Sequence, residues 1–576
     1  MTEHESSPGR GWRFWAIFFS ITVATFTTAL DTTAVSTALP TITNDLHGSQ
    51  FIWIGSAYTM SSTAFLPMSG GLAQVFGRRP TMLGSMVFFL VGSALCGAAT
   101  SMNFLIAGRT VQGVGAGGIT ALTQIILSDL VPLRTRGTFN GLIGMQVLPL
   151  AWSVASCSGP VIGGAFAENG KWRWLFYLNL FVTGLAGVLV LTFLKLKTPS
   201  GTIGQKLSKM DWIGNALVIP ASTSLMIALT WGGVQYPWSS PRVLVPLVLG
   251  IVGLGVFLLY EAMLAKHPIV PFSLMSTRTG LSGYVQAFIL ALCLTGVVYY
   301  FPIYFQACKS AGPIASGVDS LGFTSCALLS IIGGVSVAAT KRYRPQIWLG
   351  WAIVLVSFGL MSTLKDDTNL GKSVGYVILV GAGIGLVITT TYFPVLAPLP
   401  VSANAYALAL YAFARSFGQV WGVTIGGTVL QNQLLKHLPE GFSSQFPQGA
   451  QIAYSIIPII GKLPPSLSGE VRSAFATSLK VVWEVMIGIG GLGILASLLM
   501  KHLPLHTYTD DEWGVDSTSD ATAQAKAVDS QESEPKMEKN TESGEVQVLD
   551  EGTSADVETG EVTADGAAAS AVVETA

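Results

Sequence analysis

Long apolar runs, each about twenty residues, constrain this chain more than any other feature. A helix needs about 20 mostly apolar residues to cross the ~30 Å hydrocarbon core of a bilayer. The runs predict fourteen transmembrane helices, at residues 14–38, 51–73, 82–99, 104–128, 138–166, 174–195, 212–232, 243–263, 281–304, 315–340, 346–364, 373–397, 405–430 and 480–500. Residues 212–232 and 243–263 could instead form one re-entrant pair.

Charge is scarce and unevenly distributed. Only 11% of the 576 residues are charged and 50% are hydrophobic, whereas soluble domains average about 25% charged residues. Residues 509–576 hold 18 acidic and 3 basic residues, and the preceding 508 hold 14 acidic and 28 basic ones. Such an acidic segment, with Trp513 as its only aromatic residue, is predicted to be a disordered tail. Residues 1–13 are predicted to form a short N-terminal tail.

The basic residues predict which side of the membrane each loop faces, because short loops rich in Lys and Arg stay in the cytoplasm. With the N-terminus inside, sixteen basic residues lie on the cytoplasmic side and six lie in the short outer loops. Both termini are therefore predicted to be cytoplasmic. The long segment 431–479 contains prolines and no full span, so we expect it to be a packed outer loop.

One loop sequence occurs twice. The stretch GGLAQVFGRRPTML, between the second and third predicted spans, contains Gly70 and Gly71 followed by Arg78 and Arg79. The stretch GGVSVAATKRYRPQ repeats the Gly-Gly and the basic pair, as Lys341 and Arg342, between spans ten and eleven. This repeat indicates two six-helix bundles, and repeated halves are typical of transporters. We expect an all-α membrane protein with bundles at 14–200 and 281–508 and two additional spans at 201–280.

Charged residues inside spans are costly, so each is a candidate functional residue. Asp31 lies in span one, Arg109 lies in span four one turn before Gln112, and Arg415 lies in span thirteen. An arginine stays protonated, so Arg109 would hold an anion or act on a nearby acid, for which Asp31 is the candidate. Solvated roles are expected of four acids near span ends: Asp129, Glu261, Asp319 and Glu484.

Several classes of protein find no support in the sequence. The five cysteines lack metal-site spacing, the six histidines are not clustered, and no Walker A or His-Glu-x-x-His motif is present. The match of GVGAGG to a dinucleotide fingerprint is not preceded by a strand, and glycines at this density instead favour close helix packing. We expect no enzyme activity, no cofactor, no metal and no nucleic-acid partner.

Four motifs together resemble the major facilitator superfamily, and within it the fourteen-span drug:proton antiporters of fungi. The resemblance covers residues 14–500. LDTTAVSTALP is similar to the first-helix motif of that group, with Asp31 as its acid, and LIAGRTVQGVGAGG to the fourth-helix motif, whose arginine is here Arg109. The remaining motif positions are Gly70, Gly71, Gln74, Gly77, Arg78 and Arg79 in the loop, and Gly159, Pro160, Gly163 and Gly164 in span five.

The resemblance implies a monomeric plasma-membrane exporter of small hydrophobic or amphipathic molecules. Alternating access would exchange protons for substrate, with lipid as the surrounding partner and no cofactor. Gln74 stands where the loop motif usually has Asp, which weakens the expected lock between that acid and the arginines. Arg415 and the aromatic residues Tyr299, Tyr300, Phe301 and Tyr304 are candidates for a cavity between the bundles, and the alternative for the aromatic residues is contact with lipid or packing in the core. The alternatives are an uptake permease and a transporter-like sensor that signals through its tail.

Overall fold

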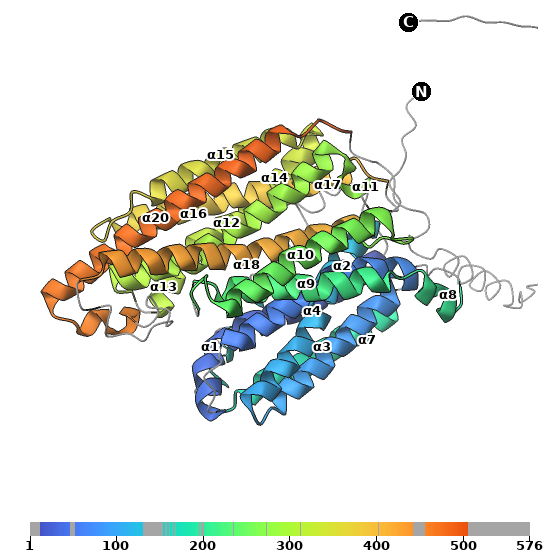
Figure 1. Cartoon of the computed structure of the whole chain (residues 1–576), viewed down its shortest axis with the longest axis horizontal. Helices are drawn as coiled ribbons and strands as arrows, with labels where there is room; N and C mark the ends of the chain where they lie inside the picture. The colour runs from blue at the N-terminus through green and yellow to red at the C-terminus, as the bar shows by residue number, and fades with distance from the viewer. Residues whose placement is uncertain are drawn as a thin grey trace, which may run out of the picture. The chain divides into compact units, whose positions relative to one another are not determined.

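The computed structural model describes residues 12–46, 52–130, 171–194, 201–233, 236–271, 273–311, 313–400, 403–439 and 456–504, with short pieces between 154 and 170 and at 196 and 442. These residues form helices and no β-sheet (Figure 1), which confirms the expected all-α fold. The predicted tail 509–576 lies outside the described residues.

Thirteen of the predicted spans coincide with described helices, in the predicted order. They are α1 (Trp12–Asp45), α2 (Ile52–Phe76), α3 (Arg78–Gly97), α4 (Met102–Leu130), α7 (Arg173–Phe193), α9 (Trp212–Trp231), α10 (Pro241–Met263), α12 (Arg278–Lys309), α14 (Ser325–Thr340), α15 (Arg344–Met361), α16 (Leu370–Thr390), α18 (Asn404–His437) and α20 (Pro465–Leu498). The predicted span 138–166 lies mostly outside the described residues, so fourteen spans stay a prediction.

Eleven helical stretches in the described residues are long and apolar enough to cross a membrane. The helices α2 and α18 are long enough but are not among them. Both carry many Ser, Thr, Gly and Gln residues, and both pack between the two bundles rather than only against lipid. Polar residues in a spanning helix are tolerated where the helix faces the protein interior.

Helix bounds differ most from expectation around the predicted outer loop 431–479. The helix α18 continues to His437, and α20 already begins at Pro465, whereas its span was predicted to begin at residue 480. Hydropathy detects only the lipid-crossing part of a helix, so its polar extension is missed. Between them, residues Ile457–Lys462 form a short 3-10 helix.

The N-terminal bundle contains α1, α2, α3, α4 and α7. The closest packing joins α4 to α2 and α3, and α7 packs against α1 and α3. Glycines on α4 allow this approach: a side chain at Gly113 would collide with α2 at Ser61, and one at Gly115 would collide with α3 at Phe89. Small residues at helix interfaces in membranes act in this way.

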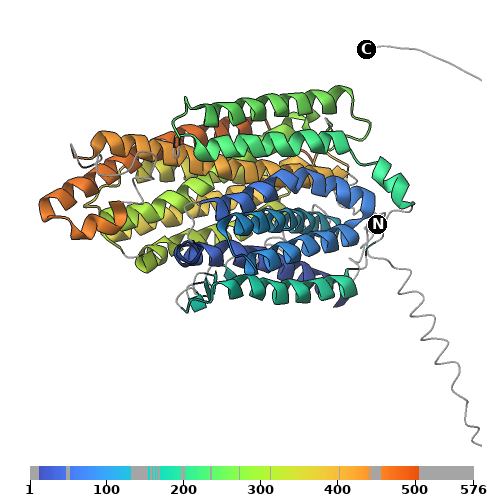
Figure 2. The ribbon, with the colours of Figure 1, turned by 60° about the horizontal axis from the view of Figure 1, so that its bottom comes forward.

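The two additional spans form a separate antiparallel pair. The helices α9 and α10 pack along each other, and Figure 2 shows them in green along one side of the bundle. Much of α10 is exposed, including Val245, Leu249 and Leu259, which fits a lipid-facing surface. The short helix α8 (Ile203–Ser208) precedes the pair. Both helices are long and apolar enough to cross a membrane, which favours two spans over one re-entrant pair.

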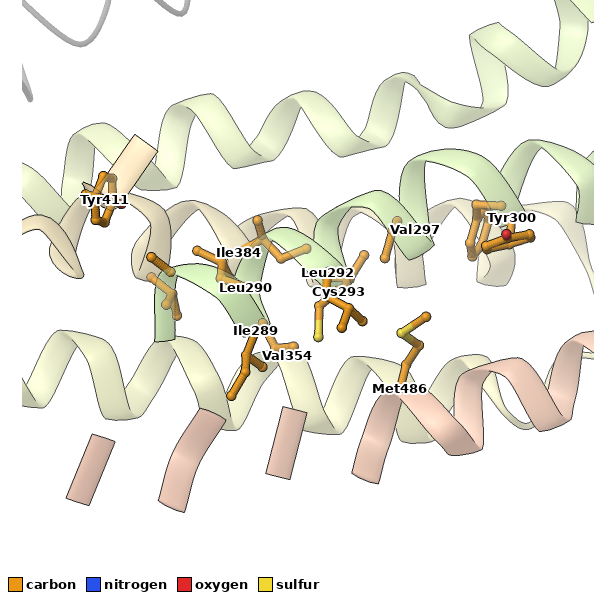
Figure 3. Packing of buried hydrophobic residues seen from close by; sticks show 14 of the residues in the cluster. Ile289, Leu290, Leu292, Cys293, Val297, Tyr300, Val354, Ile384, Tyr411 and Met486 are labelled. Atoms are coloured by element: carbon orange, nitrogen blue, oxygen red, sulfur yellow. The ribbon is translucent and has the colours of Figure 1, made fainter. Parts of the chain in front are cut away.

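The C-terminal bundle contains α12, α14, α15, α16, α18 and α20 around a continuous apolar core. Figure 3 shows one side of this core, where Leu292 and Cys293 of α12 lie near Val354 of α15, Ile384 of α16 and Met486 of α20. The large side chains Trp351 and Trp483 are fully buried in it. The helix α12 is therefore central to this bundle.

The two bundles meet mainly through α2 and α18. A side chain at Gly70 would lie 2.7 Å from the Cβ of Ala409, so only a glycine fits at this crossing. Leu66 of α2, Ala121 of α4 and Ala412 of α18 form a buried cluster one turn further along. At the end of the molecule that carries Gly77, called the Gly77 end below, the described helices of the two bundles are therefore in close contact.

Candidate functional site

Asp31 and Arg109 form a buried ion pair between α1 and α4. The guanidinium Nη1 of Arg109 lies 2.5 Å from Oδ2 of Asp31, and both side chains are at most 2% exposed. The Nε of Arg109 donates to the carbonyl oxygen of Ile54 at 3.0 Å. Its guanidinium carbon lies 4.2 Å from the centre of the Tyr58 ring, within the range of a cation–π interaction. The structure thus brings together the two charges that the sequence singled out in the first and fourth spans.

Neutral side chains complete the surroundings of the carboxylate. Oδ1 of Asp31 accepts hydrogen bonds from Nε2 of Gln112 at 2.9 Å and from Nδ2 of Asn179 at 2.6 Å. Gln112 also accepts from Arg109 Nη1 at 2.6 Å and donates to the hydroxyl of Ser93 at 2.9 Å. These five residues, called the Asp31 network, come from α1, α3, α4 and α7.

The helix packing explains why these side chains meet. Residues three apart lie on the same face of a helix, so Arg109 and Gln112 point toward α1 together. A side chain at Gly92 of α3 would collide with the backbone of Gln112, so the glycine lets α3 lie directly against this face. Sequence reasoning missed Ser93 and Asn179, although Asn179 is a polar residue inside the predicted span 174–195.

Chemically, Asp31 is the one member of the Asp31 network with a carboxylate, a group that exists in a charged and a protonated form. The guanidinium of Arg109 stays charged, and Gln112, Asn179 and Ser93 do not titrate. A proton on Asp31 would cancel the ion pair, while Arg109 would keep its bonds to Ile54 and Gln112. A buried charge without any partner strongly destabilises a folded protein. The hydrogen bonds of Arg109 to Ile54 and Gln112 would reduce that cost.

At the Gly77 end, a second buried ion pair involves the repeated loop. The Nε of Arg78 lies 2.8 Å from Oδ2 of Asp129 at the end of α4, and both side chains are 1% exposed. The solvated role expected for Asp129 is therefore wrong. Arg78 Nη1 also donates to the carbonyl oxygen of Ala73 at 3.1 Å and to Oε1 of Gln74 at 3.3 Å. Asp129 thus supplies the carboxylate that the loop sequence lacks.

The loop itself depends on glycine at one position. Gly77 has φ of 94°, in a region that other residues rarely adopt, and it separates α2 from α3. Arg79 donates to the carbonyl oxygen of Leu191 on α7. Gly71 lies near Met210 and Tyr406, so this loop reaches both the additional helices and α18.

The second copy of the loop is built differently. Lys341 caps α14 in the left-handed conformation with φ of 55°, and both Lys341 and Arg342 are exposed. Within the described residues neither side chain forms an ion pair. No counterpart of the Arg78–Asp129 pair forms there, because the turn between α14 and α15 brings no acid to these two residues.

The predicted fifth-span motif is described only in part. Gly159 and Gly163 are buried, while Pro160 and Gly164 lie outside the described residues. A side chain at Gly159 would collide with Thr33 of α1, and the Thr33 hydroxyl donates to the carbonyl oxygen of Ala155 at 3.0 Å. This segment therefore packs closely on the helix that carries Asp31.

Among the described residues, the surroundings of the α12 tyrosines fit the alternative of lipid contact and core packing. Tyr299 is 47% exposed, whereas Tyr300 and Tyr304 are buried. Tyr300 donates to the carbonyl oxygen of Val423, and Tyr304 to that of Lys365 at 2.9 Å. Phe301 packs against Trp483 inside the C-terminal bundle. Tyr299, Tyr300 and Phe301 are successive residues of a helix and point in different directions, so the four aromatic residues cannot all face one cavity.

A different aromatic group lies on the side of α18 that faces the N-terminal bundle. Phe417 packs against Phe288 and stacks on Phe413 at 5.7 Å, and Phe413 joins the cluster shared with α2 and α4. The indole Nε1 of Trp421, next to Phe417, is buried without a hydrogen-bond partner among the described residues. Arg415 is half-buried, and it too forms no ion pair within that part of the chain.

Comparison with known proteins places the chain in a family. The model of the Major Facilitator Superfamily matches residues 21–423. The MFS-type efflux pump LUC4 of Fusarium sp is 38% identical over 521 residues, covering 89% of this chain and 92% of that protein. The efflux pump FUS6 of Gibberella fujikuroi is 38% identical over 516 residues, covering 88% and 92%. An MFS-type transporter of the acurin A biosynthesis cluster in Aspergillus aculeatus is also 38% identical, over 524 residues, covering 89% and 94%.

Solved structures agree on the fold. A double-tryptophan mutant of XylE superposes with a TM-score of 0.52 at 14% identity, covering 86% of this chain and 97% of that one. The human organic anion transporter MFSD10 gives a TM-score of 0.51 at 14% identity, covering 84% and 100%. Sequence, fold and relatives agree: this multi-pass membrane protein is a transporter, not an enzyme, and belongs to the major facilitator superfamily.

Proposed function

We propose that the chain exports small hydrophobic or amphipathic molecules in exchange for protons, by alternating access. The observation that carries the proposal is the buried Asp31–Arg109 ion pair, which contains one titratable carboxylate inside a spanning bundle. Intramembrane ion pairs of this kind mark proton pathways in transporters. The test is substrate transport into proteoliposomes under an imposed pH gradient.

The helix α2 is the element through which protonation of Asp31 would affect the crossing of α2 and α18 at Gly70 and Ala409, which is called the gate below. Its backbone at Ile54 accepts from Arg109, and the ring of Tyr58 lies under the guanidinium. The other end of the same helix carries Gly70, which contacts α18 of the opposite bundle. A helix that touches the Asp31 network at one end and the partner bundle at the other can transmit a change between them.

The aromatic group on α18 is the proposed substrate surface. Phe288, Phe413 and Phe417 supply apolar rings between the bundles. Within the described residues, Trp421 adds an N–H donor without a hydrogen-bond partner, and Arg415 adds a cation without an ion pair. Binding sites for small molecules combine apolar walls with a few such polar groups. This composition favours an aromatic or polycyclic substrate that carries a carbonyl or an acidic group.

Export is favoured over uptake by the names of the relatives. LUC4 and FUS6 are named efflux pumps, and a further relative is named for a biosynthesis cluster. A fungal secondary metabolite is therefore the first substrate class to screen. Accumulation inside inside-out vesicles on acidification of their lumen would support proton-driven export, and accumulation only under the opposite gradient would support uptake.

Gln74→Asp is expected to stabilise the closed Gly77 end. The new carboxylate would join Arg78, which already bonds to Gln74 and Asp129, and charged hydrogen bonds are stronger than neutral ones. An Ala409→Cys reporter placed at the closed crossing should then react with a membrane-impermeant thiol reagent roughly three- to tenfold more slowly. Gln74→Asn, which has the size of Asp without its charge, is the control. Equal labelling rates in the Asp and Asn variants would show that no charge-based lock exists here.

Trp421→Phe is expected to weaken substrate binding without changing the maximal rate. The substitution keeps an aromatic ring and removes only the buried indole N–H, so KM should rise up to about tenfold. Trp483→Phe is the matched control, since its indole N–H is also unpaired but its ring stacks on Phe358 inside the C-terminal bundle. An equal change of KM in both variants would argue against a substrate role for Trp421.

A further inference from the structure

A cavity of about 330 Å³ opens at the Gly77 end, outside the sites described above. Its walls come from the end of α2, the start of α18, the helix α8 and the segment that follows α10. Four basic side chains line it, and they define what is called the basic pocket: Lys206, Lys209, Lys266 and His267. Gln74 and Tyr406 complete the wall toward the two bundles.

The charges of the basic pocket are not balanced by the protein. Within the described part of the chain, none of the four basic side chains forms an ion pair or a hydrogen bond, and no carboxylate is among the lining residues. Two acids of the same region are buried and already engaged. Asp211 accepts from the backbone of Gly214 at 2.8 Å and from Tyr260, and Glu261 accepts from the backbone of Ile269 and Val270.

Hydrogen bonds fix the segments that form the walls of the basic pocket. The carboxylate of Glu261 holds the segment that carries Lys266 and His267, because its two oxygens accept from Ile269 and Val270 at 3.2 Å each. The solvated role expected for Glu261 is therefore wrong: the residue is 4% exposed. On the other wall, Thr202 and Gln205 form a capping box that fixes the start of α8.

Exposed apolar residues lie next in sequence to the lysines of the basic pocket, and they are called its apolar rim. Ile203 is 72% exposed and Leu207 follows one turn later on α8, so one face of this short helix is hydrophobic while Lys206 lines the cavity. Met263 and Leu264 at the end of α10 are 78% and 73% exposed. Apolar side chains beside lysines at the end of a spanning helix are typical of the membrane interface, where acyl chains and headgroups meet.

We propose that the basic pocket binds the headgroup of an anionic phospholipid from the adjacent leaflet, which the loop charges predict to be the cytoplasmic one. The lysines and His267 would hold the phosphate groups, and the apolar rim would contact the acyl chains. Three lysines favour a headgroup with more than one negative charge, such as a phosphorylated inositol. The apolar rim argues for a lipid over a free anion, which would gain nothing from Ile203 or Met263.

Occupation of the basic pocket would act on the gate. Its lining joins the linker segments to Gln74 of α2 and Tyr406 of α18, next to the crossing of Gly70 and Ala409. A ligand that bonds to both sides of this crossing binds the closed arrangement more tightly than an open one. By mass action it would shift the population toward closure of the Gly77 end. This role is independent of the transported substrate and of proton coupling.

The test uses the full chain in nanodiscs of phosphatidylcholine, titrated with short-chain phosphatidylinositol 4-phosphate. Lys206→Gln, Lys209→Gln and Lys266→Gln are combined in one variant. Because each lysine near a membrane surface contributes about fivefold in affinity, the triple variant should bind the probe roughly a hundredfold more weakly. The matched control removes the same charge elsewhere, at three exposed lysines outside the pocket: Lys171→Gln, Lys372→Gln and Lys462→Gln.

Three outcomes would overturn the proposal. The triple variant could bind the probe like the wild type, which would place the lipid elsewhere. Soluble inositol 1,4-bisphosphate could bind as tightly as the lipid, which would make the pocket a site for free phosphates. A polyglutamate peptide could displace the lipid at equal charge concentration, which would indicate an acidic protein segment as the ligand. The proposal is supported if the triple variant loses binding of the lipid, the control variant binds it like the wild type, and the lipid binds more tightly than the soluble competitors.

Discussion

Asp31→Asn is expected to reduce transport driven by a pH gradient to the level of vesicles without protein. Asparagine has the shape of aspartate but cannot take up or release a proton, so the network loses its one titratable group. The substitution also places an amide NH2 group either beside Nη1 of Arg109 or beside the two donors Gln112 and Asn179, so at least one hydrogen bond of the network is lost. Uptake of substrate by proteoliposomes under an imposed gradient measures the effect.

Two controls separate loss of coupling from loss of structure. Asp45→Asn changes the same residue type on the same helix, at a half-exposed ion pair with Arg173, and should leave transport intact. The Asp31→Asn protein should still equilibrate substrate across the membrane without a gradient. Gradient-driven transport that survives in Asp31→Asn would show that the proton binds elsewhere.

Arg109→Ala is expected to destabilise the folded protein by about 3–5 kcal/mol, besides abolishing coupled transport. The cost arises because Asp31 would remain buried without its cation, and the carbonyl oxygen of Ile54 would lose its donor. Thermal unfolding in detergent should show a clear fall of the melting temperature. Size-exclusion chromatography checks that the variant still folds at low temperature.

The double variant Asp31→Asn with Arg109→Ala tests whether these effects share one origin. Removing both charges leaves no unpaired buried ion, so part of the stability lost in Arg109→Ala should return. Residues in one ion-pair network typically show interaction energies of about 0.5–3 kcal/mol. Simple addition of the two single effects would show that Asp31 and Arg109 are not energetically coupled.

The sequence predicted the helical fold and the charged members of the network for a physical reason. A charge inside a twenty-residue apolar run stands out because it is costly there, so Asp31 and Arg109 could be singled out without knowledge of their contact. Asn179 and Ser93 carry no charge, and neutral polar residues are common in spanning helices. Their part in the network depends on the close packing at Gly92, which hydropathy does not report.

The contacts of the loop at the Gly77 end, in contrast, could not be predicted from the sequence. The loop sequence lacks an acid, and the partner of Arg78 comes from Asp129, 51 positions away along the chain. The position of Asp129 near a helix end predicted a solvated side chain, but the contact between α3 and α4 buries it. The surroundings of the α12 tyrosines could not be predicted for a related reason. A run of aromatic residues does not show which side of a helix faces the other bundle.

The central claim is that protons and substrate move in opposite directions through one protein. The direct measurement is a pH-sensitive dye inside proteoliposomes with no imposed pH gradient, to which a transported substrate is added on one side. In the wild type, we expect substrate flux to drive protons in the opposite direction across the membrane. In Asp31→Asn, we expect the dye signal to disappear. Substrate flux of normal size without any proton movement in the wild type would contradict it.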